Sequence, residues 1–192
     1  MMKNKKNIII SISVISLVLL LVIVPTVLAY MFKKSNRVEN SFSESVVMSE
    51  VSEEYDKALN RKTSVKLKNT GNVDSYLRLK LVTYWVDANG DVVSKPSEMP
   101  SISYDTTNWL KDGDIYYYKE IVEPGESTPE FLSSGASIVL ADTESYSVMG
   151  NSTPVYQVVE ILSEAVQGNP KDAAEELWTN VSVDANGKLE LK

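Results

Sequence analysis

The 192-residue chain contains no cysteine and no histidine. Without cysteine it cannot form a disulfide, use a thiolate as a nucleophile, bind zinc through sulfur or carry a lipid on a cysteine. Without histidine it lacks the commonest general base and the main nitrogen ligand for metals, which excludes a His-Glu-x-x-His zinc protease. An enzyme would have to rely on carboxylates, and we read the pairs Glu53-Glu54 and Glu175-Glu176 as acidic surface. We therefore expect neither an enzyme nor a cofactor.

Positive charge is scarce outside the first residues of the chain. Residues 1–34 hold five of the 19 Lys and Arg residues and none of the 26 Asp and Glu residues. The remainder is strongly acidic and repels phosphate backbones, and no basic stripe interleaves with aromatic residues. Nucleic acid is therefore not expected as a partner.

Residues 1–29 have the pattern of a signal peptide or membrane anchor. A basic start precedes an uncharged run, residues 8–32, that is long enough to span a bilayer as a helix. Pro25 lies near its outer end, and Val-Leu-Ala at 27–29 suits a signal peptidase, which predicts cleavage between Ala29 and Tyr30. Retention of the run as an anchor, with Lys33 and Lys34 at the outer interface, is the alternative. Both place the rest of the chain on the extracellular face of the membrane or in the medium.

The exported part divides into a polar lead-in (30–45), a β-sandwich domain (46–180) and a C-terminal hairpin or tail (181–192). Val65 and Leu67 alternate with lysines, the period of two of a half-buried strand. The same period continues beyond the turn residues 69–72. One face holds Val73, Leu77, Leu79, Leu81 and Trp85, and the other holds Asp74, Arg78 and Lys80.

Further strand and turn signals predict an all-β fold. Val46, Met48 and Val51 suggest a first strand, the Asn-Gly pair at 89–90 predicts a hairpin returning through Val92 and Val93, and residues 115–122 form another strand. Shorter candidates lie at 131–132 and 137–141. Short strands with regular turns favour an antiparallel sandwich of jelly-roll or immunoglobulin-like type over a parallel sheet.

The C-terminal third is less uniform. Residues 155–167 fit a helical stripe slightly better than a half-buried strand with Val155, Val159, Ile161 and Ala165 on one side. Asn169-Pro170 suggests the start of one short helix through Trp178. Residues 184–187 repeat the Asp-Ala-Asn-Gly of residues 87–90 and predict a terminal hairpin.

Several blocks are familiar in this order: Val-Leu-Ala-Tyr at 27–30, Val-Glu-Asn-Ser-Phe at 38–42, KNTGNVDSYLRLKLV at 68–82, Tyr-Trp-Val-Asp at 84–87, Trp109, the tyrosines at 116–118, Val-Glu-Pro-Gly-Glu-Ser at 122–127 and Glu-Ala-Val-Gln at 164–167. The chain resembles the exported Firmicutes proteins that a SipW-type signal peptidase processes, related to the TasA/camelysin family. The resemblance implies a jelly-roll-like sandwich, processing by that peptidase, and a role at the cell surface or in matrix fibres. It also implies that residues 155–167 form a closing strand.

Three sets of residues are candidate sites. A strand with Val46, Met48 and Val51 is a candidate donor to a neighbour's sheet edge. A glycan or protein platform is suggested by the aromatic residues Tyr104, Trp109, Tyr116, Tyr117 and Tyr118. Asp87, Asn89 and Asp91, and less completely Asp184 and Asn186, offer oxygen ligands for calcium, although a plain turn explains them better and no metal is expected.

An isopeptide bond from Lys66, Lys68 or Lys80 is not expected, because all three lysines fall on the predicted solvent face. The expected function is thus a cell-surface or extracellular-matrix structural protein, which assembles with copies of itself in the manner of a biofilm-matrix subunit or with another protein at the surface. The alternative is a monomeric binding module, anchored or secreted, that uses the aromatic cluster.

Overall fold

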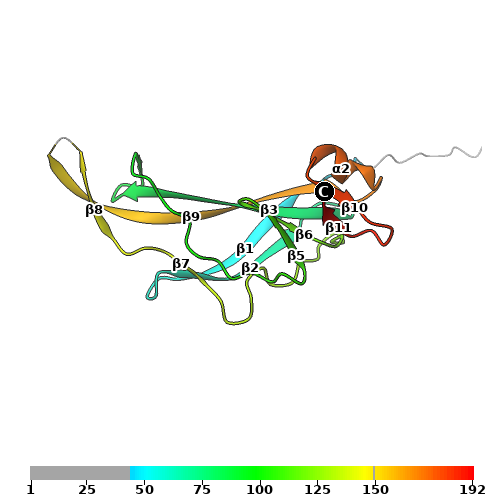
Figure 1. Cartoon of the computed structure of the whole chain (residues 1–192), viewed down its shortest axis with the longest axis horizontal. Coiled ribbons are helices and arrows are strands. Elements are labelled where there is room, and N and C mark those ends of the chain that lie inside the picture. Colours follow the sequence, from blue (N-terminus) through cyan, green and yellow to red (C-terminus); the bar gives the residue numbers. More distant parts are fainter. Residues whose placement is uncertain (1–43, 149) are drawn as a thin grey trace, which may run out of the picture. The chain divides into compact units, whose positions relative to one another are not determined.

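The computed structural model describes residues 44–148 and 150–192, whose regular structure is almost entirely antiparallel β-strand (Figure 1). The strands are β1 (Ser49–Asp56), β2 (Arg61–Asn69), β3 (Ser75–Asp87), β4 (Val92–Val93), β5 (Trp109–Asp112), β6 (Ile115–Tyr118), β7 (Ile138–Val139), β8 (Glu144–Val148), β9 (Asn151–Gln167), β10 (Val181–Val183) and β11 (Leu189–Leu191), and the described residues include one short helix, α2 (Asp172–Leu177). The all-β class is confirmed.

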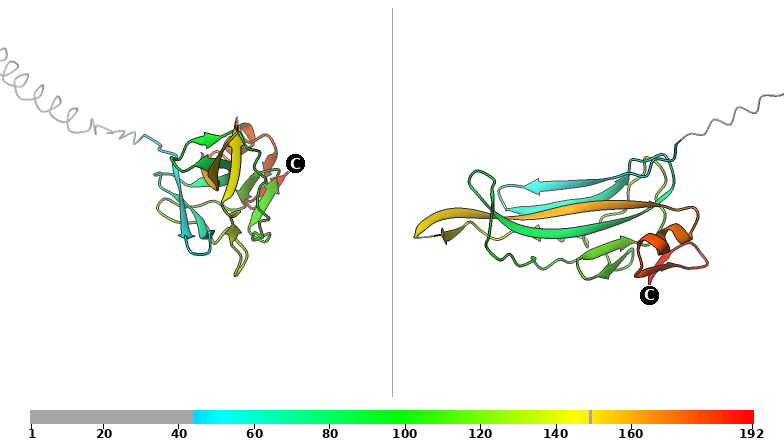
Figure 2. Two further views of the ribbon diagram at one scale, coloured as in Figure 1. Left: turned by 90° about the vertical axis from the view of Figure 1, so that its left-hand side faces the viewer. Right: turned by 90° about the horizontal axis from the view of Figure 1, so that it is seen from above.

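The strands form three antiparallel sheets. The first has the order β1-β2-β7, the second has the order β5-β6-β3-β9-β8 with β4 beside β3, and the third is the hairpin β10-β11. The longest pairing joins β3 to β9, in register from Ser75 opposite Gln167 to Asp87 opposite Val155. These two strands run side by side (Figures 1 and 2).

The first two sheets share a core, because the predicted alternation holds. Val65 and Leu67 of β2 are fully buried and face Leu77, Leu79 and Leu81 of β3 in one cluster. Burial of each such side chain contributes about 1.5–3 kcal/mol. Buried aromatic rings complete the cluster: Trp109, Tyr116, Tyr118 and Phe131.

Residues 155–167 belong to a strand, as the resemblance implied, and not to the helix that their periodicity favoured. Val155, Val159 and Ile161 on one face of the strand are buried, whereas Leu162, which a helix would place on the same stripe as Val155 and Val159, is 45% exposed. Pairing with every residue of β3 decides the outcome, since this long partner strand satisfies the backbone groups on one side of the whole segment.

A second, smaller core lies on the opposite face of β3. Tyr76 and Tyr117 are buried there against Trp178, Val181 and Leu189. The C-terminal hairpin forms as predicted. It is no separate tail, however, because Val181 and Leu189 share this core with Tyr76 of β3 and Tyr117 of β6. A domain boundary at residue 180 would cut through it.

Three local predictions need correction. The helix starts at Asp172 after Lys171, with no side-chain cap, while the Asn169–Pro170 bond is cis. Residues 131–132 form no strand, and Leu132 makes a single bridge to Tyr104. Strand β6 stops at Tyr118 rather than continuing to residue 122.

Among the described residues, no helix has the length and hydrophobicity needed to cross a membrane. The predicted leader, residues 1–29, and the predicted cleavage site between Ala29 and Tyr30 lie outside the described residues.

Candidate functional site

The loop of residues 69–72, here called the clamp loop, holds the segment that leads into β1. The backbone amide of Val46 donates to Asn72 Oδ1 at 2.7 Å, and the amide of Asn72 donates to the Val46 carbonyl at 2.9 Å. Asn72 Nδ2 reaches the carbonyl of Glu44 at 2.9 Å, and the amide of Thr70 reaches that of Met48 at 3.1 Å. Four hydrogen bonds thus fix the point at which the preceding chain joins the domain.

Gly71 makes this close approach feasible. A Cβ atom on Gly71 would overlap the Val46 carbonyl oxygen and come within 3.0 Å of the amide nitrogen of Met48. Glycine is the residue that lets two backbones approach so closely. Gly71, the glycine of the block at 68–82, is therefore needed at this position because the segment that leads into β1 packs directly against it.

Asn69 joins the two most specific blocks of the sequence. It is fully buried, and its Nδ2 donates to the carbonyls of Val73 and Val122 at 2.8 and 2.9 Å. Its backbone amide donates to the Glu126 carbonyl, and its carbonyl accepts from the Gly125 amide, both at 2.9 Å. The clamp loop and the Pro-Gly-Glu-Ser turn therefore form one hydrogen-bonded unit.

The candidate donor residues are already engaged within their own domain. Val51 lies in β1 opposite Leu67 of β2 and packs against the core. Val46 and Met48 are 38% and 54% exposed, but their backbones are held by the clamp loop. None of the three is a free donor strand in this structure, because Val51 already pairs with β2, and Val46 and Met48 are already hydrogen-bonded to the clamp loop.

An unpaired seam lies where the two large sheets meet. We define the seam as the outer edge of β1 together with the outer edge of β9 over residues 156–167. Strand β1 ends its sheet, and β8 covers β9 only as far as Val155. The two strands approach each other (Figure 2), yet no strand pairing joins them in the described part of the chain.

The aromatic cluster is mostly core. Trp109, Tyr116, Tyr117 and Tyr118 are each less than 10% exposed. Tyr117 points to the second core, with its ring centroid 5.5 Å from that of Trp178, so neighbouring tyrosines face opposite sides of the sheet. Burial, together with the nearby Glu120 carboxylate, raises the pKa of Tyr118. Only Tyr104 of the five predicted residues is half-buried and lines a pocket.

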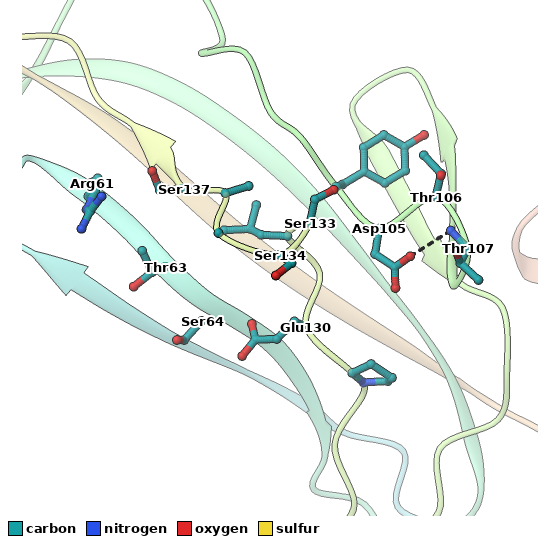
Figure 3. Close-up of a pocket in the computed structure, with 15 residues that line it drawn as sticks. Arg61, Thr63, Ser64, Asp105, Thr106, Thr107, Glu130, Ser133, Ser134 and Ser137 are labelled. Carbon is teal, nitrogen blue, oxygen red and sulfur yellow. Dashed lines mark hydrogen bonds between the residues drawn. The ribbon is translucent and has the colours of Figure 1, made fainter.

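That pocket lies between β2, the loop around Tyr104 and the loop of residues 129–137 (Figure 3). Its volume is about 910 Å³. Arg61 and the loop of residues 104–107 lie at opposite ends of the view in Figure 3, with serine and threonine hydroxyl groups between them. The lining hydroxyl residues are Thr63, Ser64, Thr106, Thr107, Ser133, Ser134 and Ser137.

The two Asp-Ala-Asn-Gly segments fold into the same turn. In each, the glycine amide donates to the aspartate carbonyl, at 3.1 Å for Gly90 to Asp87 and for Gly187 to Asp184. Only the glycines have positive φ, so these are type I turns closed by a glycine bulge rather than the tighter turn in which the Asn also has positive φ.

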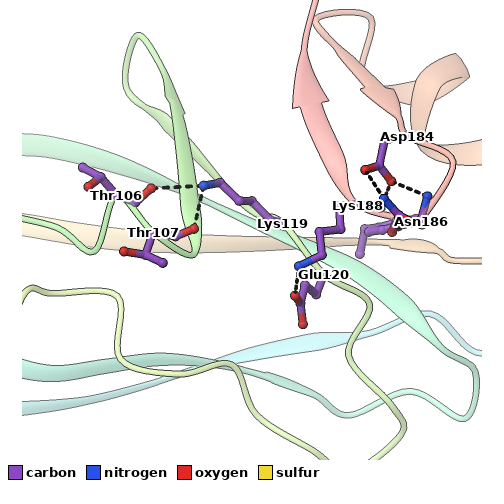
Figure 4. Close-up of polar contacts among 9 residues, drawn as sticks. Thr106, Thr107, Lys119, Glu120, Asp184, Asn186 and Lys188 are labelled. Atoms are coloured by element: carbon purple, nitrogen blue, oxygen red, sulfur yellow. Dashed lines mark hydrogen bonds and ion pairs between the residues drawn. The ribbon is translucent and has the colours of Figure 1, made fainter.

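In both turns the aspartate side chain accepts backbone hydrogen bonds from its own turn. Asp87 Oδ1 accepts the backbone amides of Asp91 and Asn89, and Asp184 Oδ1 accepts those of Lys188 and Asn186 (Figure 4). These backbone hydrogen bonds lower the pKa of both carboxyl groups. No cluster of three or more acidic side chains that could hold a metal ion occurs within residues 44–148 and 150–192.

The lysines considered for an isopeptide bond lie on the solvent side, as the alternation indicated. Lys66 pairs with Glu130 at 3.3 Å and Lys80 with Asp114 at 3.4 Å, and all four side chains are more than 40% exposed. Lys68 is also exposed. An isopeptide bond needs a buried lysine, so these positions do not fit one.

Comparison of the chain with protein-family models, with curated proteins and with solved structures finds no match in any of the three. The resemblance to the SipW-processed proteins therefore rests on the sequence blocks alone. Two of those blocks are the ones that the structure brings together at Asn69.

Proposed function

We propose that this protein is an exported structural protein of the cell surface or extracellular matrix, whose copies assemble by adding a strand at the seam. The leader pattern of residues 1–29 supports export, and the acidic surface and the lack of cysteine and histidine argue against catalysis. The resemblance favours a jelly-roll-like sandwich, with which two antiparallel sheets around one core are compatible.

The observation that carries this proposal is the open edge of β9. Within the described residues, positions 156–167 have a hydrogen-bonded neighbour on the β3 side only. An unpaired edge presents a row of amide and carbonyl groups that template the addition of another strand. Such strand addition is a general mode of protein assembly, in which main-chain hydrogen bonds provide affinity and side chains provide specificity.

The lead-in segment is the donor that we favour. The clamp loop fixes where the chain joins the domain, and residues 30–43 precede that point once the leader is removed. Fourteen extended residues span at most about 50 Å, while the β9 edge over residues 156–167 is about 40 Å long. Val38 and Phe42 would fall on the same side of an added strand and provide apolar contacts along the seam.

A binding module built on the aromatic cluster is a less suitable function. Four of its five residues are buried in the two cores, where a ligand has no access to them. A SipW-type signal peptidase remains the partner that we propose for removal of residues 1–29, which would free the lead-in for assembly.

The test compares two purified chains, residues 30–192 and residues 44–192, by size-exclusion chromatography with light scattering. The second chain retains every described strand and the clamp loop. We expect large assemblies from the first and monomers from the second. Monomers from both chains, or equal assembly of both, would refute strand donation by the lead-in. The N-terminus of protein recovered from culture, with and without the peptidase, tests the processing step.

A further inference from the structure

The pocket beside Tyr104 is a feature that assembly at the seam does not use. Its volume of about 910 Å³ falls in the range of small-ligand sites. Several observations show that its walls are held in place, and together they indicate the chemistry of a ligand.

The ring of Tyr104 is held by two other rings. It stacks on Phe131 with 6.0 Å between centroids and 15° between planes, and it meets Tyr116 edge-on at 5.0 Å. Both partners belong to the buried core. A half-buried ring fixed in this way offers an apolar surface at little entropic cost on binding.

The loop that carries Thr106 and Thr107 is also fixed. Lys119 Nζ donates to the carbonyls of these two residues at 3.1 and 2.6 Å (Figure 4). Asp105 Oδ1 accepts the amide of Thr107 at 2.9 Å, and Asn108 donates to its other oxygen at 2.6 Å. The threonine side chains thus lie on a braced wall of the pocket.

On the β2 side, Ser64 has a positive φ of 53°. It lies at an irregularity in the pairing, where the partners of β1 and β2 shift between Ser52 and Glu54. A non-glycine residue in this conformation is strained, and bulges of this kind redirect side chains next to functional sites. The strain occurs on the pocket lining.

Arg61 has an unmet hydrogen-bonding need. Its Nε is buried and, within the described part of the chain, has no hydrogen-bond acceptor. The carboxylate of Asp56 is 3.5 Å away, which is a long ion pair and not a hydrogen bond. The Arg61 side chain as a whole is 39% exposed and lines the pocket, so its other guanidinium N–H groups can donate to oxygen atoms of a ligand.

The charges of the lining decide the class of ligand. One cation, Arg61, stands against two carboxylates, Asp105 and Glu130, so an anionic ligand gains no net attraction. Hydroxyl groups from three chain segments and one aromatic face suit a molecule with many hydroxyl groups and an apolar ring face. We propose that this pocket binds an uncharged saccharide, with one sugar ring against Tyr104 and its hydroxyl groups on the serine and threonine side chains.

The test measures binding of chitotriose, cellotriose and maltotriose, with trigalacturonate as the anionic comparison, to the mature chain by titration calorimetry. Ser134 is exposed on the pocket rim, so Ser134→Trp fills the pocket without disturbing the core. Ser152→Trp, at an exposed position of β9 outside the pocket, is the matched control. We expect at least one neutral trisaccharide to bind, a loss of about tenfold or more for Ser134→Trp, and no loss for the control.

Arg61→Gln provides a second variant, with an expected loss of affinity and unchanged far-UV circular dichroism. The proposal is overturned if none of the neutral sugars binds, if Ser134→Trp binds as well as the control, or if trigalacturonate binds more tightly than the neutral sugars. Chain assembly is measured separately by sizing, so failure here does not depend on the outcome at the seam.

Discussion

Gly71 lies against the carbonyl oxygen of Val46, with no room between them for a side chain. The contact joins a turn inside the domain to the segment through which the preceding chain enters it. The backbone amides of Asn72 and Val46 both form hydrogen bonds across this contact. A change at Gly71 should therefore loosen residues 44–48, here called the entry segment, before it affects the distant core.

Gly71→Ala is therefore expected to lower the free energy of unfolding by about 1–3 kcal/mol, because the added methyl group must displace the entry segment. Hydrogen exchange of the Val46 and Asn72 amides should accelerate more than that of β3. Thr70→Ala is the control, since its side chain is exposed and its backbone hydrogen bond to Met48 remains. Equal behaviour of the two variants would show that the clamp loop does not hold the segment.

Arg78 connects the second core to the long β3–β9 pair. Its guanidinium lies 4.7 Å from the Trp178 ring centroid and donates twice to Glu164 Oε2, at 2.9 and 2.6 Å. We expect Arg78→Ala to destabilise the protein by about 1–3 kcal/mol in urea unfolding, through lost stacking and ion pairing. Lys80→Ala, two residues along the same face, removes an exposed pair and should change stability by less than about 0.5 kcal/mol. Similar losses of stability in the two variants would contradict the role of Arg78 in joining the second core to the β3–β9 pair.

Acid should weaken the two Asp-Ala-Asn-Gly turns. The pKa values of Asp87 and Asp184 are lowered in the folded state, so the unfolded chain takes up protons first as the pH falls. The stabilisation is complete above the unfolded value of 3.8 and disappears as the pH falls through the folded pKa.

The double variant Asp87→Asn/Asp184→Asn keeps the acceptor oxygens but removes the charge. Its deficit in unfolding free energy relative to wild type should therefore be largest near neutral pH and should shrink as the pH falls through the lowered pKa of the two carboxyl groups. Urea unfolding at several pH values measures this deficit. A deficit that stays constant across the range would mean that the two carboxylates do not provide the effect.

The burial of Trp109 indicates that this residue belongs to the core and not to a ligand-binding platform. It is 1% exposed and packs against Phe131 and Tyr118, with ring centroids 5.2 and 5.4 Å away. Trp109→Ala should cost about 3–5 kcal/mol of stability. Tyr156→Ala, at a tyrosine that is 43% exposed, should cost less than about 1 kcal/mol. A folded, fully stable Trp109→Ala protein would contradict burial.

The strands that the sequence predicts most clearly are those with one apolar face, which is buried in the core, and one charged face, which is exposed to solvent. Val65, Leu67 and the leucines of β3 alternate with charged residues, so their burial follows from the period of two. The hairpin at residues 181–191 was found from its turn residues. By contrast, β9 carries apolar residues on both faces, such as Val159 and Leu162, and its period is ambiguous without knowledge of β3 as its partner.

Contacts between residues far apart in the chain were not predictable. Nothing in the local sequence indicates that Asn69 meets Val122, or that Tyr76 is covered by the C-terminal hairpin. The pocket was missed for the same reason, because its hydroxyl groups come from three separate segments. Tyr104 was the one residue of the pocket that the sequence indicated, through its place among the aromatic residues. The positive φ of Ser64 leaves no sequence signal at all.

The most direct test of assembly at the seam is hydrogen–deuterium exchange, comparing assembled chains of residues 30–192 with monomeric chains of residues 44–192. Strand addition predicts new protection concentrated in residues 49–56 and 156–167, with the β3–β9 hydrogen bonds unchanged. Protection elsewhere on the domain, or assemblies with no added protection at either edge, would contradict it.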